Sequence, residues 1–588
     1  MKTRKQIEDK YKWNLDMFTS NEEIEKVFKK MEELATIFPK YKGKLNNIDT
    51  LYEYISKYIP DEINIEKLAF YISNNLSVEK SNVEFLKLEQ RFDRLYSKLN
   101  QAEAFFMPEC LNFSDEYIDK LSKDKRFDEF KNFVNDLKKK KPHRIDENTN
   151  LLLSKMSNFL GNNHNIHSII TNTEMEYEDA IDSNGNKKKI DQGNIFSCLQ
   201  SSDGKLRETA FSSRMNAYSK LNKTFSELYL KDIEQDAFMT KLKNYPTLLD
   251  YVLESADVPK SVFENVIKSV NKNIPTLQDY VRHQGKVKKN KNFAYYDLFE
   301  DEKIGGKINV EKAKSILLDS LKVLGDDYIS KVNRKLNDKS IDYKPNKDKR
   351  GGAYCSDTYG TKSVILMNFT NDFNSVNTLA HEMGHCINAE YYNENQSYQN
   401  AGITIFAAEI ASTVNEILLN QYMLSHCKQS EKAYYIHDFL DGVRSTIYRQ
   451  TLFSEFELYA HEMVENEQPI TYLELNQKYE ELNEKYYGNS CKLPKLFKYE
   501  WSYIPHFYRP YYVYSYATGM ITAITIANRI LNEKGFTEKY IKFLSNGTNR
   551  PAVEILKEIG IDLTTEQPFN EAFDFIKQQL KLYKSVTK

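Results

Sequence analysis

The sequence is poor in the features that mark disulfide-linked and nucleic-acid-binding proteins. Its six cysteines occur without CxxC spacing, which argues against a disulfide framework and a thiolate zinc site and predicts free thiols. Lysine plus arginine (82) nearly balances aspartate plus glutamate (84). The resulting net charge of -2 gives no general attraction for nucleic acid or an anionic membrane surface, so peptides or small molecules remain as partners.

Long apolar runs are also missing. No stretch approaches the length of a membrane span, and the first residues, MKTRKQIEDKYKWNL, lack the apolar segment of a signal peptide. We therefore expect a cytoplasmic protein with no membrane partner. A chain of 588 residues exceeds what one hydrophobic core usually supports, so we also expect several lobes around a cleft.

Glycine (20) and proline (14) are too scarce to interrupt the chain often, and the segments between them have apolar residues at helical spacing. This pattern predicts a mainly α protein, with helices near 21–38, 82–106 and 127–138. A strand-like stretch over 169–177, followed by the turn residues of SNGNKKK at 183–189, predicts a small hairpin.

We place a domain boundary near residue 200. The prediction is an N-terminal helical lobe over 1–200 and a catalytic domain over 201–588. Within the second part the helical pattern ends after Lys349. The segment that follows, RGGAYCSDTYGTKSVILMNF, contains two adjacent glycines and an apolar run over 364–369. This run is typical of a buried or edge strand, and it leads into the segment that carries the chemistry.

The segment NTLAHEMGHCINAEYY contains an HExxH arrangement. His381 and His385 are four residues apart, so on a helix their imidazoles lie on one face about one turn apart and can share a single zinc ion. Glu382 then lies beside the metal, where it can take a proton from the attacking water without being a ligand. HEMVE at 461–465 lacks the second histidine, and we expect it on an exposed helix face.

A catalytic zinc needs a third protein ligand, and the downstream candidates are Glu390, Glu394, Glu409 and Glu416. Glu390 is turned away on the same helix, and Glu394 lies in the polar stretch NENQSYQN. Glu409 lies in the apolar, helix-like run IFAAEIASTVNEILL, where an unpaired carboxylate would be costly to bury and a metal would offset that cost. Glu416 is either an alternative ligand or, as we favour, a hydrogen-bond partner of a ligating imidazole.

The segments KRGGAYCSDTYG, LMNF, LAHEMGH and AAEIASTVNE, in this order, resemble the thimet oligopeptidase family and most closely its oligoendopeptidase F branch. WNL, YDLF, YRQTLFSEFE and IPHFYRPYYVYSYATG extend the resemblance over almost the whole chain. The family's third zinc ligand is a glutamate that corresponds to Glu409. One departure is Asn388, where relatives often have a further histidine, but it lies outside HExxH.

The resemblance implies a two-lobed helical body that encloses a deep channel, with a small β-sheet beside the active site. It also implies a histidine and spaced tyrosines in contact with the substrate and its oxyanion, a role for which the tyrosine-rich HFYRPYYVYSY is suited. On this basis His506, Tyr508 and Tyr516 are candidate catalytic residues, with Tyr512 and Tyr514 as alternatives to Tyr516. The candidate substrate-binding residues are Gly352, Ala353, Tyr354, Tyr512 and Tyr514.

The predicted function is zinc-dependent endopeptidase cleavage of short unfolded oligopeptides, with one Zn²⁺ per chain. Zinc held by His381, His385 and Glu409 polarises water, Glu382 takes the proton, and the strand over 364–369 pairs with the substrate backbone. The alternatives are a dipeptide-releasing exopeptidase of the same fold and a non-catalytic, zinc-containing peptide-binding protein. Manganese or cobalt would fit the same ligands, and both a monomer and a homodimer remain open.

Overall fold

The computed structural model describes residues 1–156, 160–301 and 306–587. Contacts within the chain group it into two compact units, which are described separately. Unit 1 consists of Met1–Arg144, Gly306–Met423 and Ile526–Gly560, and unit 2 of Ile145–Gly305, Leu424–Thr525 and Ile561–Lys588. This grouping by contact differs from the lobes predicted on either side of residue 200, which remain a prediction.

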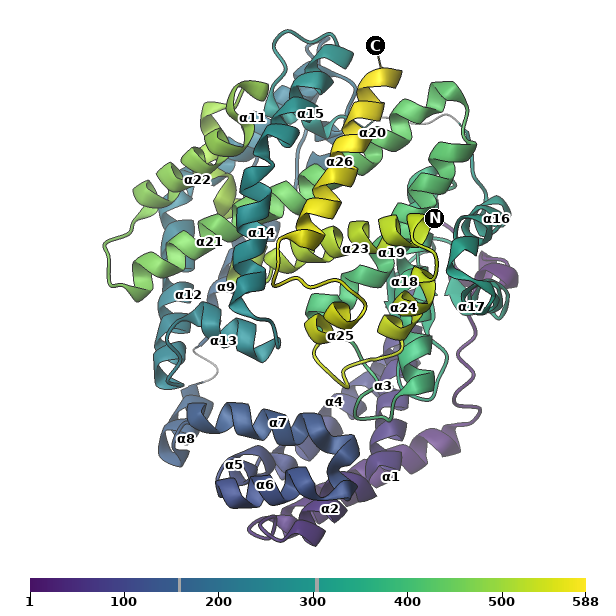
Figure 1. Cartoon of the computed structure of the whole chain (residues 1–588), viewed down its shortest axis with the longest axis vertical. Helices are drawn as coiled ribbons and strands as arrows, with labels where there is room; N and C mark the ends of the chain where they lie inside the picture. Colours follow the sequence, from purple (N-terminus) through teal and green to yellow (C-terminus); the bar gives the residue numbers. More distant parts are fainter. Residues whose placement is uncertain (157–159, 302–305, 588) are drawn as a thin grey trace. The chain divides into compact units, whose positions relative to one another are not determined.

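Most of the chain is helical, as the sparse glycine and proline predict (Figure 1). The helices of unit 1 are α1 (Asn21–Ile37), α2 (Ile48–Lys57), α3 (Ile59–Val78), α4 (Val83–Glu103), α5 (Phe106–Cys110), α6 (Asp115–Lys123), α7 (Lys131–Lys140), α16 (Val310–Ser320), α17 (Asp326–Asn337), α18 (Phe373–Asn395), α24 (Phe536–Leu544) and α25 (Ala552–Glu558). The first predicted helices therefore match α1, α4 and α7 closely.

The helices of unit 2 are α8 (Glu147–Met156), α9 (Asn163–Ile169), α10 (Ile195–Leu199), α11 (Gly204–Lys220), α12 (Asn222–Leu242), α13 (Leu248–Ser255), α14 (Lys260–Lys272), α15 (Ile274–Val287), α20 (Lys432–Val443), α21 (Arg449–Glu465), α22 (Tyr472–Tyr487) and α26 (Gln567–Val586). Two further helices, α19 (Ile405–His426) and α23 (Tyr514–Asn532), contribute residues to both units. No helix in the described part of the chain has both the length and the apolar character that crossing a membrane requires.

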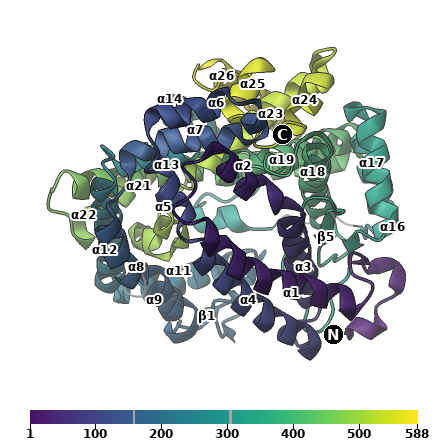
Figure 2. The ribbon, with the colours of Figure 1, turned by 90° about the horizontal axis from the view of Figure 1, so that it is seen from below.

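A three-stranded sheet in unit 1 adjoins the helix that carries HExxH. Its order is β3 (Ile341–Asp342), β5 (Val364–Leu366), β4 (Tyr354–Ser356), with β3 parallel and β4 antiparallel to β5. Both β4 and β5 pack against α18, and Figure 2 shows β5 near α18, which lies between α17 and α19. The predicted small sheet beside the site is therefore present.

The position of β5 corrects one expectation. Because β5 is the central strand, its backbone groups already pair with β3 on one side and β4 on the other, so it has no free edge for a substrate. Its three residues are fully buried, and Trp13 packs against Val364 and Leu366 from the same unit. The strand over 364–369 was thus predicted correctly as a strand but wrongly as the substrate-pairing edge.

Two other expectations also need correction. The stretch 169–177 is not a strand: α9 ends at Ile169 and a turn of π-helix follows, while the hairpin strands are β1 (Ala180–Ile181) and β2 (Lys187–Lys188) around the predicted turn. Its β-branched residues suggested a strand, but tertiary packing overrode that local preference. His461 of HEMVE is 1% exposed rather than on an open face, and burial lowers its pKa to about 3.

Candidate metal centre

The HExxH motif lies within α18, a helix whose start is fixed locally. Asp372 caps α18 by accepting a hydrogen bond from the Ser375 backbone N–H at 2.8 Å. The helix then presents His381 and His385, which are partly exposed, on one face, while Val376, Leu379 and Met383 are fully buried. This burial of the opposite face anchors the helix, so the two imidazoles share one side as the spacing predicts.

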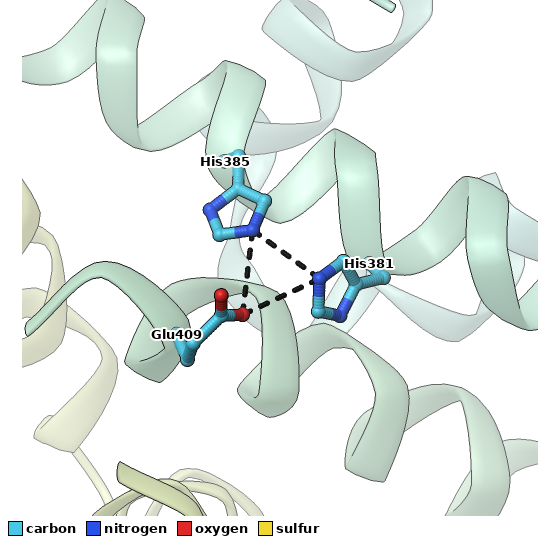
Figure 3. Close-up of side chains that lie close together, drawn as sticks. All are labelled: His381, His385 and Glu409. Carbon is cyan, nitrogen blue, oxygen red and sulfur yellow. Dashed lines mark hydrogen bonds and ion pairs between the residues drawn. The ribbon is translucent and has the colours of Figure 1, made fainter. Parts of the chain in front are cut away.

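Glu409 on α19 completes a three-residue cluster with the two histidines (Figure 3). The Nε2 atoms of His381 and His385 are 3.2 Å apart, and Glu409 Oε2 is 3.3 Å from the first and 3.5 Å from the second. Tetrahedral zinc with bonds of about 2.0–2.1 Å to nitrogen and oxygen needs donor atoms about 3.3–3.4 Å apart. The three donors therefore fit one metal ion.

The competing glutamates lie elsewhere. Glu390 forms ion pairs with Arg334 and with the fully buried Lys335, and Glu394 forms an ion pair with Lys331. Their carboxylates are engaged by cations from α17. Of the four candidates for the third ligand, Glu409 is the one that converges with both histidines in the described residues.

Glu416 contacts His381 on the ring nitrogen that points away from the other two donors. Its Oε1 accepts a hydrogen bond from His381 Nδ1 at 2.6 Å, which leaves His381 Nε2 facing Glu409. Burial alone would lower the pKa of His381, but the hydrogen bond to Glu416 and the charges of Glu416 and Glu409 raise it to about 9. Excess negative charge of this kind favours a divalent cation in place of the proton.

Asn377 holds Glu416 in turn, a contact that sequence reasoning missed. Its Nδ2 donates to Glu416 Oε2 at 2.8 Å from one turn before His381 on α18. Both carboxylate oxygens of Glu416 are thereby fixed, one by the amide and one by the imidazole. The position of Asn377, four residues before His381, was the available signal, because that spacing places it on the same helix face.

Glu382 is buried beside the ligands. It is 7% exposed, and burial raises its pKa, opposed by the charges of His381 and His385 and by a hydrogen bond from the Cys355 backbone N–H. A carboxylate whose pKa lies above its ordinary value is better suited to exchange a proton near neutral pH. The geometry therefore separates Glu382 from the three converging donors.

The cluster opens into a cavity of about 390 Å³ within unit 1. Ala353 and Tyr354 of the predicted substrate-binding set line it, next to Cys355. Gly352 precedes them with a φ of 75°, and its carbonyl accepts a hydrogen bond from Asn368.

Asp357 and Tyr392 also line this cavity, and sequence reasoning missed both. The Tyr392 hydroxyl donates to Asp357 Oδ2 at 2.8 Å. Asp357 lies in KRGGAYCSDTYG, a segment already singled out, so it could have been found. Asn388, the departure from the family pattern, lines the cavity as well and donates to the Leu544 carbonyl.

The other predicted residues belong to unit 2. Within it His506, Tyr512 and Tyr516 form one aromatic cluster: the imidazole centroid is 6.4 Å from the Tyr512 ring and 6.1 Å from the Tyr516 ring, and the two tyrosine rings are 5.1 Å apart. Tyr508 packs instead against His164 and His167.

Tyr514 differs from its neighbours. It is 2% exposed and packs edge-on against Phe263, so its predicted part in substrate binding gains no support from its surroundings. The roles of the remaining three tyrosines and of His506 remain predictions.

Two histidines and a glutamate from adjacent helices, with a buried carboxylate beside them, form the ligand set of a metallopeptidase of the HExxH class. The model of peptidase family M3 matches residues 197–575, and that of oligopeptidase F matches residues 109–177. The chain therefore belongs to peptidase family M3, in its oligopeptidase F subfamily. It is an oligopeptidase F-type endopeptidase, and its substrates are peptides.

Individual relatives cover 97–100% of this chain. Oligopeptidase PepF of Bacillus subtilis is 32% identical over 98% of this chain and 87% of its own length. An oligoendopeptidase F homolog of Borreliella burgdorferi is 30% identical over 100% of both chains. The crystal structure of oligoendopeptidase-F from Enterococcus faecium has a TM-score of 0.74 at 26% identity, covering 97% of this chain and 99% of its own. The resemblance and the enzyme class inferred from sequence are thus confirmed.

Proposed function

We propose that this endopeptidase holds one Zn²⁺ per chain between His381, His385 and Glu409 and cleaves short unfolded peptides. The convergence of these three donors to within 3.2–3.5 Å of one another is the observation that carries the proposal. When bound, the zinc would supply Lewis acidity to the attacked carbonyl and to water. The alternative of a non-catalytic protein with structural zinc fits less well, because closed sites normally have four protein ligands.

Glu382 is proposed as the general base and then the general acid. Its carboxylate takes the proton of the attacking water and passes it to the leaving amine. The raised pKa supports this use, and the Cys355 N–H holds the carboxylate in place. Glu416 orients His381 through the 2.6 Å hydrogen bond, and Asn377 orients Glu416.

The substrate backbone is proposed to pair with β4 rather than with β5. β4 is an edge strand of its sheet, and its residues Tyr354 and Cys355 line the cavity at the metal centre. An extended peptide added to such an edge gains main-chain hydrogen bonds that do not depend on its sequence. This arrangement suits an enzyme that accepts many short peptides.

The remaining assignments follow the family resemblance. His506, Tyr508 and Tyr516 are proposed to stabilise the oxyanion, with Tyr512 as the alternative to Tyr516 because it lies in the same aromatic cluster as His506 and Tyr516. A deep channel, a catalytic domain over 201–588 and a cytoplasmic location complete the proposal. The match of the M3 model to residues 197–575 supports the domain boundary near residue 200.

The decisive experiment replaces Glu382 with Gln and follows a quenched fluorescent peptide that is blocked at both ends. We expect zinc content to stay at one per chain while kcat falls by about 10²–10⁴-fold, the range for losing a positioned acid–base group. Glu462→Gln is the matched control, because Glu462 sits in a second HEM triplet but on an exposed helix face. Near-normal turnover in Glu382→Gln would remove Glu382 from the mechanism. Failure to cleave the blocked peptide, with release of dipeptides from an unblocked one, would instead favour the exopeptidase.

A further inference from the structure

Two cysteine thiols lie side by side under the metal cavity. Cys355 is the middle residue of β4, and Cys386 directly follows the ligand His385 on α18. The Cys355 thiol donates a hydrogen bond to Cys386 Sγ with the sulfur atoms 3.2 Å apart. Both are free thiols, brought together by the packing of β4 on α18.

The two thiols differ in access. Cys386 is fully buried, whereas Cys355 is partly exposed and lines the cavity at the metal centre. The hydrogen bond with Cys386 and burial raise the pKa of the Cys355 thiol, so we expect it to react slowly with an oxidant that enters the cavity, and Cys386 lies directly behind it. This is the arrangement of an attacked thiol with a resolving thiol next to it.

The pair is coupled to the catalytic groups through the backbone. The Cys355 N–H donates to the Glu382 carboxylate, and Cys386 adjoins His385. A covalent bond between the sulfurs would bring them from 3.2 Å to about 2.05 Å, so β4 and α18 must approach or twist by about 1 Å. A displacement of that size at reacting groups can lower a rate by about 100-fold.

We propose that Cys355 and Cys386 form a reversible regulatory disulfide that a peroxide installs and that switches the peptidase off. The regulatory part rests on the proposed function of the site. Among the described residues, the histidine–glutamate cluster is the one group of three or more His, Cys, Asp or Glu side chains whose ligand atoms converge, and neither cysteine belongs to it. The chemistry of the thiol pair is that of a redox-sensitive modification.

The reaction balances in two steps. The Cys355 sulfur attacks one peroxide oxygen, the O–O bond breaks, and Cys355 becomes a sulfenic acid with release of one water. The Cys386 sulfur then attacks Cys355 Sγ, the S–O bond breaks, and a second water leaves. Overall the two thiols lose two electrons and two protons and the peroxide gains them. A dithiol returns both electrons and both protons.

Zinc-loaded protein is treated with hydrogen peroxide, and one half is then reduced with dithiothreitol. Non-reducing peptide mapping by mass spectrometry should find a linked pair of peptides that contain Cys355 and Cys386. Turnover of the quenched peptide should fall by at least tenfold and recover after reduction. Zinc content is measured alongside, so that loss of the metal is distinguished from a change in the loaded enzyme.

Cysteine variants identify the thiols that respond to peroxide. The peroxide-treated activity of each variant is compared with the activity of the same variant in dithiothreitol. Cys355→Ser should lose the peroxide response, and Cys386→Ser should form no linked peptide and accumulate a sulfenic acid at Cys355 that dimedone traps. Cys427→Ser, which removes another partly exposed thiol, should respond like the native protein.

The outcomes separate the two proposals. Absence of the linked peptide from peroxide-treated native protein overturns the disulfide, and a linked protein with unchanged turnover overturns its regulatory role. If the reduced, zinc-loaded protein cleaves no peptide at all, the proposed function fails. The disulfide map then decides the modification site independently of activity.

Discussion

Replacement of Gly384 by alanine should disturb the metal centre without touching a ligand. Gly384 lies between Glu382 and His385 on α18, where the helix meets α19. A Cβ at this position would lie 2.6 Å from the Ala411 carbonyl oxygen and 2.6 Å from the Ser412 Cα. Both neighbours are backbone atoms, so no side-chain rotation can relieve the overlap.

The size of the disturbance follows from these distances. Ordinary carbon contacts are about 3.5–4.0 Å, so the two helices must separate by about 1 Å at this point. Overpacking of this kind costs about 1–3 kcal/mol, offset by about 1 kcal/mol from the better helix propensity of alanine. Glu409 lies two residues before Ala411 on α19, so it moves with that helix away from both histidines.

Three measurements test this prediction. We expect weaker zinc retention against a competing chelator, a fall in kcat/KM of up to about 100-fold at saturating zinc, and a lower melting temperature. Gly442→Ala is the matched control: Gly442 is also helical, but a Cβ there would meet only the Met520 Cε at 3.7 Å, an ordinary contact. That variant should be as stable as the native protein or slightly more so. Native zinc affinity and turnover in folded Gly384→Ala would refute the close-packing argument.

Three further predictions concern positioning, stability and the metal. Asn377→Ala should weaken zinc binding about 10–100-fold in a metal-competition assay, because it frees Glu416. The control Thr378→Ala, at the neighbouring residue, should keep the native affinity. Equal zinc affinities of the two variants would show that the amide contact is incidental. Asp203 caps α11 and also binds the Ser183 hydroxyl and N–H, so Asp203→Ala should lower stability by about 1 kcal/mol in thermal unfolding. Those Ser183 hydrogen bonds lower the pKa of Asp203 from 3.8 to about 2. The ionised carboxylate therefore stabilises the folded protein above about pH 4, and this contribution is lost as the pH falls towards 2. Asp203→Asn should keep most of the cap and lose this acid dependence, and an unchanged acid dependence would implicate other groups. Removal of the metal with a chelator should stop peptide cleavage and lower the melting temperature. A bound ion at about 100 times its Kd stabilises the folded protein by about 2.7 kcal/mol. An unchanged melting temperature would mean that the ion is not bound.

The parts of the site that were predictable are those set by local spacing. A four-residue interval places His381 and His385 on one helix face wherever the helix goes, and α18 confirms it. Spacing alone could not identify Glu409 as the third ligand, because Glu390, Glu394 and Glu416 are also near in sequence. The burial argument and the family resemblance both favoured Glu409, and the distances agree.

The parts that could not be predicted depend on pairing and packing between distant segments. The apolar run over 364–369 is a strand, but only the order β3-β5-β4 shows that it is central and that β4 is the edge. His461 was expected on an exposed helix face because HEMVE lacks the second histidine, yet its imidazole is buried, with the Tyr511 ring 5.1 Å away between ring centroids. The Cys355–Cys386 contact joins residues whose sequence spacing carries no signal of proximity.

Two glutamates on neighbouring helices illustrate how surroundings rather than residue type assign the roles. Burial pushes the pKa of both upwards, but at Glu409 the hydrogen bond and charge of His385, together with the charge of His381, lower it to about 2. At Glu382 burial prevails, so its pKa is raised. Glu409 thus remains an anion suited to hold a cation, whereas Glu382 can gain and lose a proton. A carboxylate in the place of Glu409 would therefore serve as a metal ligand, and one in the place of Glu382 as a base. The glutamate of HExxH can act as the base only where helix packing supplies a second glutamate as the metal ligand.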